Sequence, residues 1–451
     1  MSNTDRLTTK LIRHRIIRFD KSRIYKLPDG TESCLFIDFK QAVSFPDLQC
    51  DLCQLYCNEI TKPFAVLPDC IIGVPDDSIP MAAQISSKLG LPLLMIRKES
   101  KHRGGDSLID GNVKRGANVI IIDDIISTGS SCVDIVRKLR DCRLKPIRII
   151  SLLKRYGAGG AVCLERLFRG EGELYRGIVP MKSLFCLKDI EFSVKLKESR
   201  LCVAVDVDCM SDLARVVEKL HRHVSIIKLH IDLITDFEPY GSKNSINSLQ
   251  NLKNRYGVLL WEDSKFADIA QVTHRQIIGG IHQISSWADI VSVHSIAGPD
   301  IFKTASGAYL GGCKIVVIGE MSSPGNMLDS SYLDRTLDML DPLRHNILNK
   351  DLVTNGSEYG IAKNVVGITV QTDVDTDLLK IVSGIRHDAG NAGDAGNAGY
   401  AVGIDNLDIT NLGQRYRKPS EVPWADIIIV GSGITDSIDS ELFESVINQY
   451  V

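Results

Sequence analysis

The sequence has no long hydrophobic run and little net charge. No uninterrupted apolar stretch approaches the roughly 18 residues that a membrane-spanning helix needs. The formal net charge is -3 at pH 7 and the pI is about 6.4. These values give no electrostatic footprint for nucleic acid or for an anionic membrane. We therefore expect small-molecule substrates, and neither nucleic acid nor a membrane as a partner.

A disulfide framework and a secretion signal are also missing. The twelve cysteines are scattered without regular spacing, which suits reduced thiols and predicts a cytoplasmic protein. The basic N-terminal segment is followed by no apolar stretch or cleavage site, so we expect it to form the first helix of a domain. Cys50, Cys53 and Cys57 could bind a metal. Because they interleave with apolar residues of a predicted helix at 48–60, core packing is favoured.

The length of the chain predicts more than one domain. Its 451 residues, 44% of them hydrophobic, can bury at least two cores, because single cores stop growing near about 250 to 300 residues. We predict two α/β domains, covering residues 1–186 and 187–451.

A buried strand followed by two acids and a hydroxyl-rich turn is the most informative feature of the first half. The apolar run 119–122 predicts a strand covered on both faces, and the amphipathic pattern 133–139 predicts a helix that starts just past Ser131. Asp123 and Asp124 lie at the end of the strand, where they can accept hydrogen bonds from ribose hydroxyls or hold Mg²⁺ through its waters. An acidic loop between a core strand and a helix is the alternative interpretation.

The turn after these acids is suited to an anion. It brings backbone N–H groups and the positive end of a helix dipole to one place, where a phosphate can bind. Its residues are Ser127, Thr128, Gly129, Ser130 and Ser131. The loop 73–80 follows another apolar strand and can present backbone amides to pyrophosphate. The stretch 96–105 gathers five basic side chains and is either a solvated charged loop or a flap that closes over the leaving group.

These segments resemble the 5-phosphoribosyl-1-diphosphate (PRPP) signature of type I phosphoribosyltransferases, and the first half resembles the orotate phosphoribosyltransferases in particular. The resemblance implies a parallel sheet flanked by helices, and transfer of the ribose phosphate of PRPP to orotate with Mg²⁺ as cofactor. It implies displacement at the anomeric carbon, in which pyrophosphate leaves as Mg²⁺ and the flap neutralise its charge. Lys101 matches the flap lysine that enters the site during catalysis. The further substrate-binding residues implied are Lys26, Phe36, Arg97, Lys98, Arg103 and Arg155.

The first half departs from this family's pattern in two segments. Arg103 stands where the flap usually has a histidine, and this exchange keeps a cationic side chain available. Asp76 and Asp77 stand in the pyrophosphate loop, where Tyr-Thr or Tyr-Lys is commoner. We expect these acids to weaken the binding of the diphosphate.

Eight short apolar runs recur in the second half, separated mostly by stretches long enough for helices. Eight strand–helix units over about 250 residues predict a TIM barrel, whose chemistry lies at the carboxyl ends of the strands. The predicted strands are 201–207, 225–231, 258–263, 290–295, 314–320, 365–370, 379–385 and 427–433.

The densest group of polar residues follows the third of these runs. Asp263 and Lys265 are two apart on an extended chain, so their side chains should point the same way. Asp268 lies beyond the strand end, where it could reach a neighbouring subunit. Lys228, from the preceding strand, should add a second lysine. A weak surface salt bridge is the alternative interpretation.

This half resembles the orotidine 5′-monophosphate decarboxylases over roughly residues 200–435. Lys228, Asp263, Lys265 and Asp268 match the family's Lys-Asp-Lys-Asp tetrad, in which the last aspartate comes from the partner subunit of a homodimer. The resemblance implies that the aspartates crowd the substrate carboxylate, CO₂ leaves, and Lys265 protonates the remaining carbon without a metal or cofactor. The substrate-binding residues implied are Asp206, His230, Ser322, Gln414, Tyr416, Gly431 and Ser432.

Several positions of this half depart from the family. Ser432 replaces the arginine that grips the phosphate, so we predict weaker affinity with the chemistry retained, unless Arg386, Arg415 or Arg417 substitutes for it. Other departures are Leu229, Val272 and Ser383. The segment 389–399, rich in alanine, glycine and asparagine, is expected to be disordered or to form a loose lid.

Together the two resemblances imply the last two steps of UMP synthesis. Orotate and PRPP would give orotidine monophosphate (OMP) and pyrophosphate, and OMP would then give UMP and CO₂. One alternative keeps the transferase but makes the barrel a degenerate nucleotide-binding or dimerising module. A second alternative is a regulatory nucleotide sensor without turnover in either half.

Overall fold

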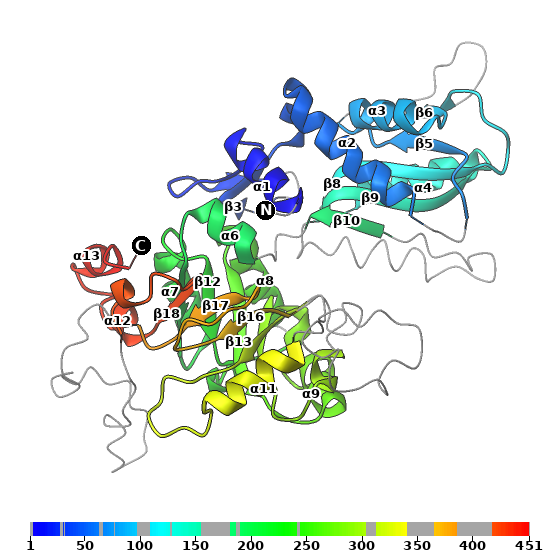
Figure 1. Ribbon diagram of the computed structural model, residues 1–451. Helices are drawn as coiled ribbons and strands as arrows, with labels where there is room; N and C mark the ends of the chain where they lie inside the picture. Colours follow the sequence, from blue (N-terminus) through cyan, green and yellow to red (C-terminus); the bar gives the residue numbers. More distant parts are fainter. Residues whose placement is uncertain are drawn as a thin grey trace, which may run out of the picture. The chain divides into compact units, whose positions relative to one another are not determined.

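The computed structural model divides the chain into two units, residues 1–196 and 197–451, each with its own core (Figure 1). The boundary predicted between residues 186 and 187 lies just ahead of helix α6 (Ile190–Lys197) and stays a prediction. The structure describes residues 3–27, 30, 32–62, 66–75, 77–96, 109–126, 129–154, 181–185, 190–240, 244–303, 313–340, 365–385 and 417–450.

The first unit is built on a six-stranded sheet in the order β10-β9-β8-β5-β6-β7. All its pairs are parallel except β6 with β7. Its strands are β5 (Cys70–Gly73), β6 (Leu93–Ile96), β7 (Ile109–Asp110), β8 (Asn118–Ile126), β9 (Lys145–Lys154) and β10 (Met181–Phe185). Residues 119–122 of β8 are fully or almost fully buried, as expected for a strand covered on both faces.

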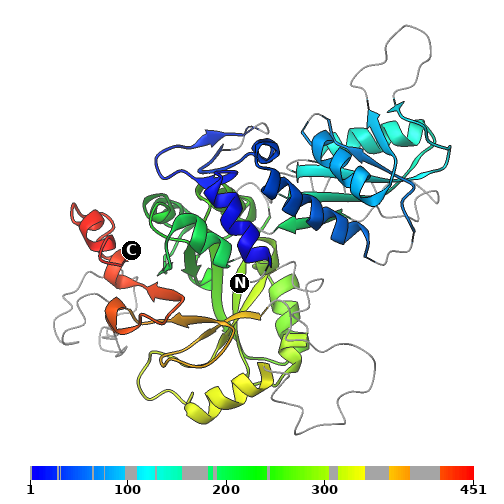
Figure 2. The same cartoon turned by 45° about the horizontal axis from the view of Figure 1, so that its top comes forward.

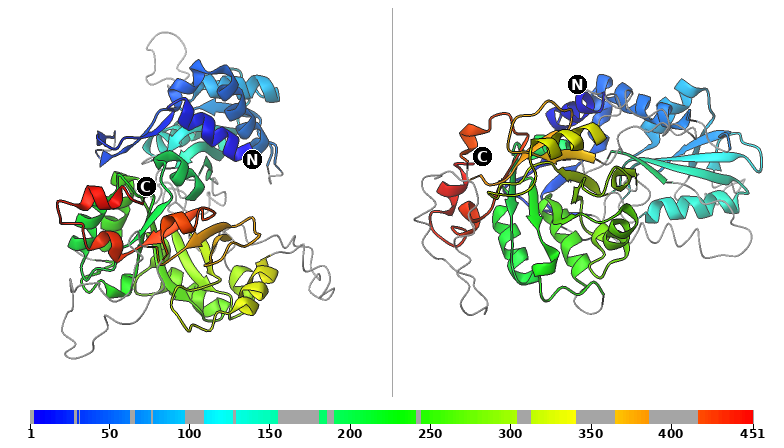
Figure 3. Two further views of the ribbon diagram at one scale, coloured as in Figure 1. Left: turned by 60° about the vertical axis from the view of Figure 1, so that its left-hand side comes forward. Right: turned by 60° about the horizontal axis from the view of Figure 1, so that its bottom comes forward.

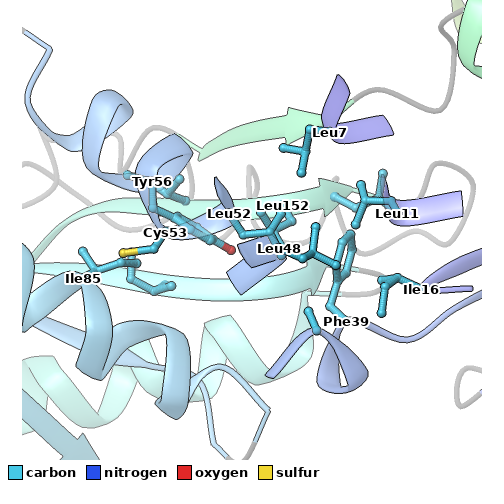
Figure 4. Packing of buried hydrophobic residues seen from close by; sticks show 14 of the residues in the cluster. Leu7, Leu11, Ile16, Phe39, Leu48, Leu52, Cys53, Tyr56, Ile85 and Leu152 are labelled. Carbon is cyan, nitrogen blue, oxygen red and sulfur yellow. The ribbon is translucent and has the colours of Figure 1, made fainter. Parts of the chain in front are cut away.

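The helices of this unit bury apolar side chains in its core. They are α1 (Asn3–Arg13), α2 (Pro46–Ile60), α3 (Ile79–Leu89) and α4 (Ser130–Asp141), in addition to α6. Helix α2 starts at a proline, whose fixed φ suits the first turn, and buries Leu48, Leu52 and Tyr56 in the core shown in Figure 4. Cys53 and Cys57 lie in the same core with their Sγ atoms 3.9 Å apart. The core-packing interpretation is therefore confirmed for Cys53 and Cys57, and it is wrong for Cys50, which lies on the exposed side of the same helix.

Shorter elements complete the first unit. Strand β1 (Ile17–Phe19) pairs with β4 (Leu35–Ile37), and β2 (Tyr25–Lys26) pairs with β3 (Glu32–Ser33), both antiparallel. A 3-10 helix, η1 (Phe39–Ser44), follows. The predicted basic first helix is confirmed as α1, in which Lys10 forms ion pairs with Asp47 (3.0 Å) and Asp51 (2.5 Å) of α2.

The second unit is a closed barrel of eight parallel strands, and each of the eight predicted runs coincides with one of them, although β13 continues three residues past the predicted end at 263. The strands are β11 (Leu201–Ala204), β12 (Ile226–Leu229), β13 (Leu259–Phe266), β14 (Ile290–His294), β15 (Lys314–Ile318), β16 (Val365–Thr369), β17 (Leu379–Val382) and β18 (Ile427–Val430). The barrel and the helices outside it can be followed in Figures 2 and 3. The carboxyl ends of all eight strands therefore meet at one rim, where the site residues were predicted.

Helices separate the barrel strands. The α-helices are α7 (Met210–Leu220), α8 (Ser245–Tyr256), α9 (Ala270–Gly279), α10 (Asp300–Lys303), α11 (Ser330–Leu340), α12 (Ser432–Thr435) and α13 (Phe443–Ile447). The 3-10 helices are η2 (Ile231–Leu233), η3 (Ile284–Ser286) and η7 (Pro419–Glu421). Within the described part of the chain, no helix combines the length and the apolar character needed to cross a bilayer.

Candidate active sites

Asp123, the first of the two predicted signature acids, lies among buried side chains of the first unit. Strand β8 continues past the predicted end and includes both acids, so Asp123 is held by the sheet and is only 6% exposed. Ser78 Oγ donates to Asp123 Oδ1 and Cys132 Sγ donates to Oδ2, each at 3.3 Å. The buried hydroxyl of Tyr56 donates to the backbone oxygen of Asp123. Burial, together with the charge of Asp124, raises the pKa of Asp123 to about 7.

A tight turn and a helix start follow these acids. Gly129 has φ +77°, in the left-handed region that favours glycine, and precedes α4, which begins at Ser130, slightly earlier than predicted. Ser130 and Ser131 thus lie in the first turn of this helix, at the positive end of its dipole. Ser127 and Thr128 lie outside the described residues.

The acid of the pyrophosphate loop has a partner that the sequence did not indicate. Lys40, from η1, forms an ion pair with Asp77 at 2.8 Å. Burial raises the pKa of Asp124, Asp77 raises it further, and Lys40 lowers it. Lys40 thus offsets part of the negative charge that Asp77 adds beside the signature acids. Asp76 lies outside the described residues.

Only two of the other predicted substrate-binding residues of this unit, Lys26 and Phe36, lie within the described residues. Phe36 lies on β4, its ring 4.9 Å from that of Tyr25 and 4.4 Å below the guanidinium of Arg18. Lys26 is exposed on β2. The predicted flap and orotate-binding residues lie outside the described residues: Arg97, Lys98, Lys101, Arg103 and Arg155.

Asp123 should make the stability of the first unit depend on pH. Its folded pKa of about 7 is above the ordinary value of 3.8, so the folded state holds this proton more tightly than the unfolded state. The contribution of Asp123 to the free energy of unfolding is therefore complete below its unfolded pKa and is lost as pH rises through about 7. We expect Asp123→Asn, which cannot ionise, to match the wild type in thermal midpoint near about pH 4 and to exceed it by several degrees near about pH 8. Scanning calorimetry of both proteins over this range checks it, and a constant difference would contradict it.

The predicted tetrad of the second unit is assembled at the rim of the barrel, except for its last member. Asp263, on β13, is 5% exposed, and its Oδ2 lies 2.6 Å from Lys228 Nζ and 2.7 Å from Lys265 Nζ. Burial alone would raise the pKa of Asp263, but the two ammonium groups hold it at about 2. Burial lowers the pKa of Lys228 and the ion pair with Asp263 raises it, with a net rise. The site therefore holds a buried carboxylate between two lysines, of which Lys228 is mostly buried and Lys265 is partly exposed.

Two more side chains fix this cluster. His230 Nδ1 lies 2.8 Å from Asp206 Oδ1, and His230 Nε2 lies 3.6 Å from Asp263 Oδ2 and 3.5 Å from Lys265 Nζ. Ser292 Oγ, on β14, donates to Asp263 Oδ1 and accepts from Trp261 Nε1 at 2.8 Å. Sequence reasoning missed Ser292, because it lies within an apolar strand with no motif around it.

A cavity of about 440 Å³ opens at this rim. It is lined by the charged cluster and by residues that directly follow β15, β17 and β18. The predicted residues that line it are Asp206, Lys228, Asp263, Lys265, Ser322, Gly431 and Ser432. Such a volume is in the range of small-ligand pockets, about 300 to 1,000 Å³.

Asp268 lies apart from this cavity within one chain. It is exposed beyond the end of β13, and its carboxylate accepts a hydrogen bond from the backbone N–H of Ile269 at 2.7 Å. Ile269 and Ile296, which follow the neighbouring strands β13 and β14, are 58% and 69% exposed.

Of the predicted residues near the phosphate position, only some are described. Arg417 is held at the mouth of the barrel, where its backbone N–H donates to Gly384 O at 2.9 Å and its guanidinium donates to Gln371 O. Gln414, Tyr416, Arg386, Arg415 and the segment 389–399 lie outside the described residues.

Comparison with known proteins finds both predicted families. Residues 58–161 match the phosphoribosyl transferase domain, and residues 199–411 match the orotidine 5′-phosphate decarboxylase / HUMPS family. The chain is 26% identical to uridine 5′-monophosphate synthase of Bos taurus over 474 residues, which cover 92% of this chain and 90% of that protein. It is 32% identical to orotidine 5′-phosphate decarboxylase of Rhizopus oryzae, over 55% of this chain and 82% of that protein. The corresponding protein of Mycosarcoma maydis is 31% identical over 54% and 77%. These matches confirm the two resemblances and the predicted fold class.

Proposed function

The chain belongs to the orotidine 5′-phosphate decarboxylase family and has a phosphoribosyl transferase domain ahead of that part, and from this premise we propose that it catalyses the last two steps of UMP synthesis. In the first reaction orotate displaces pyrophosphate from PRPP and forms OMP. In the second reaction OMP loses CO₂ and forms UMP. A degenerate barrel without catalysis is not favoured, because the cluster of Lys228, Asp263 and Lys265 is intact.

The observation that carries the decarboxylase proposal is the single buried carboxylate between two ammonium groups. The carboxylate of OMP would enter beside the buried Asp263, where two like charges repel each other. Loss of neutral CO₂ relieves this repulsion, so the transition state is favoured over the bound substrate. The electron pair of the broken C–C bond stays on the pyrimidine carbon, and the Lys265 ammonium stabilises it and donates the proton that completes UMP.

In the first unit we assign the ribose of PRPP to Asp123 and Asp124, and its 5-phosphate to the start of α4. The turn at Gly129, Ser130 and Ser131 offers backbone N–H groups at a helix N-terminus, which suits a phosphate. The carboxylates are also suitable for holding Mg²⁺ through its waters, and this ion would neutralise charge on the leaving pyrophosphate. Lys40 beside Asp77 would lessen the repulsion between the loop acid and the diphosphate.

We further propose that two chains form a homodimer with shared decarboxylase sites. In this arrangement Asp268 of each chain enters the cavity of the other and adds a second carboxylate beside that of OMP. Two observations support the proposal. Asp268 is exposed beyond the strand that carries Asp263 and Lys265. Ile269, next to it in the chain, and Ile296, just past the neighbouring strand, leave apolar surface exposed.

One incubation tests the two reactions together. Purified protein is mixed with orotate, PRPP and Mg²⁺, and the products are identified by chromatography. UMP, CO₂ and pyrophosphate are expected. Accumulation of OMP without UMP would refute the decarboxylase half and support the degenerate barrel. Absence of any nucleotide product would refute the transferase half, and OMP supplied directly would then test the decarboxylase half by itself.

Restoring the missing arginine should strengthen nucleotide binding. Ser432 lines the cavity at the start of α12, where it offers a hydroxyl instead of a guanidinium. A charge-assisted hydrogen bond to phosphate contributes about 1.5 to 3 kcal/mol, so we expect Ser432→Arg to lower KM for OMP by roughly 10- to 100-fold with little change in kcat. Initial rates at varied OMP concentration measure this. Ser432→Gln, of similar length but neutral, is the control, and an unchanged KM in the arginine variant would show that another cation already holds the phosphate.

A further inference from the structure

The end of strand β13 is irregular at the residues on which the proposed decarboxylation depends. The register between β13 and β14 shifts between Glu262 and Phe266. Lys265 has φ +48°, a left-handed conformation that is unusual for a residue other than glycine. A backbone of this kind persists only where surrounding contacts fix it. Something must therefore hold the segment in place if Lys265 is to stay 2.7 Å from Asp263.

Glu262 lies within this segment and is fully buried. Trp261, Asp263 and Lys265 line the cavity, so the side chain between the first two points to the opposite face of the barrel wall. One carboxylate oxygen of Glu262, Oε2, accepts from the backbone N–H of Ile231 at 3.0 Å. The other oxygen, Oε1, accepts from Ser264 Oγ.

These two hydrogen bonds join the strand ends that carry the charged cluster. Ile231 directly follows His230 and begins η2, just beyond the β12 strand of Lys228. Ser264 lies between Asp263 and Lys265. We infer that Glu262 is a positioning residue for decarboxylation, which clamps the end of β12 to the irregular end of β13 and so sets the spacing of Lys228, Asp263 and Lys265. The inference rests on the proposed decarboxylase function.

The chemistry of the contacts predicts which substitutions the clamp tolerates. Glutamine keeps one oxygen to accept from Ile231, and its amide N–H₂ can donate to Ser264, whose hydroxyl can reverse its role. Leucine has a similar volume but leaves the buried N–H of Ile231 without an acceptor. A displacement of about 1 Å in a catalytic group can cost on the order of 100-fold in rate. We therefore expect Glu262→Leu to lower kcat for OMP by roughly 10- to 100-fold with KM changed less than about 3-fold, and Glu262→Gln to stay within about 3-fold of the wild type.

Asp289 offers a matched control at the other end of the barrel wall. It is also fully buried, and its carboxylate accepts from the backbone N–H of Leu260 at 3.0 Å and pairs with Lys253 at 2.6 Å. Asp289→Asn should lower the thermal midpoint and leave kcat within about 2-fold, because it loosens the start of β13 and not its end. If Glu262→Leu behaves in the same way, Glu262 is structural only and the inference is overturned.

The measurements separate this inference from the proposed function. Steady-state kinetics with OMP are run on the full-length wild type, both Glu262 variants, Ser264→Ala and Asp289→Asn. A selective loss of kcat in Glu262→Leu that glutamine avoids supports the clamp, whereas equal losses in both variants overturn it. If Glu262→Leu does not fold, Ser264→Ala decides: the clamp requires a kcat several-fold lower, and an unchanged kcat refutes it.

A crystal structure of Glu262→Leu gives a readout that does not depend on turnover. The clamp predicts that Lys265 Nζ moves beyond hydrogen-bond distance of Asp263, and an unchanged pair overturns it. A wild type without decarboxylase activity would refute the proposed function, and this distance would still decide whether Glu262 positions the cluster.

Discussion

Lys265→Ala is expected to abolish decarboxylation almost completely, with a loss in kcat on the order of 10³- to 10⁴-fold. Lys265 would serve twice, because its ammonium stabilises the negative charge left on the pyrimidine carbon and then supplies the proton. General acid catalysis contributes about 10²- to 10⁴-fold, and an electrostatic contact at the reacting centre is worth about 10²- to 10³-fold. Lys265 also lies 2.7 Å from Asp263, so its removal takes away one of the two ammonium groups that offset that buried carboxylate.

The first unit supplies an internal control for this variant. Orotate and PRPP should be consumed by Lys265→Ala at the wild-type rate, with OMP accumulating in place of UMP. Both nucleotides are followed in one chromatographic assay, together with the thermal midpoint. A loss of less than about 10-fold in decarboxylation, with the fold intact, would exclude Lys265 as the proton donor.

The sequence predicted the barrel well because its strands are local features. Each of the eight apolar runs coincides with a barrel strand, and Asp263 and Lys265 do face the same cavity. The alternation of side chains along a strand predicted this, although the strand is irregular at Lys265. Strand ends were less accurate: β8 continues through Asp123 and Asp124, because pairing with β9 extends to Ile126. Such pairing is a property of the neighbouring strand and leaves no mark in the segment itself.

The contacts that hold the sites in place could not be predicted from the sequence. Lys40 and Asp77 pair across distant segments, and the serine that binds Asp263 comes from the next strand. Glu262 directly precedes Asp263 in the sequence, yet its role depends on the backbone N–H of Ile231, which lies just past the neighbouring strand β12. Long-range side-chain contacts of this kind depend on packing and carry no spacing signature. The sequence therefore indicated the reacting residues, but it gave little indication of the residues that hold them in position.

The dimer proposal predicts that two inactive variants restore each other. Asp268→Asn alone should lower decarboxylation on the order of 100-fold or more, because one of the two carboxylates that repel the substrate becomes neutral. Lys265→Ala is inactive for the separate reason given above. In a dimer of one chain of each kind, one site combines an intact lysine cluster with an intact Asp268, and the other site carries both defects.

Random pairing of equal amounts of the two chains therefore leaves about one quarter of all sites native. Co-expression of the two variants with different affinity tags, followed by purification through both tags, should give mixed dimers with about half of the wild-type kcat per dimer. The matched control pairs Lys228→Ala with Lys265→Ala, whose defects fall in the same cluster of each chain, so no native site can form.

Activity restored in the first pair and not in the second requires Asp268 to act across the subunit interface. Activity in neither pair, from folded mixed dimers, would mean that each chain builds its site alone, and the exposed position of Asp268 would then have to be explained without a shared site.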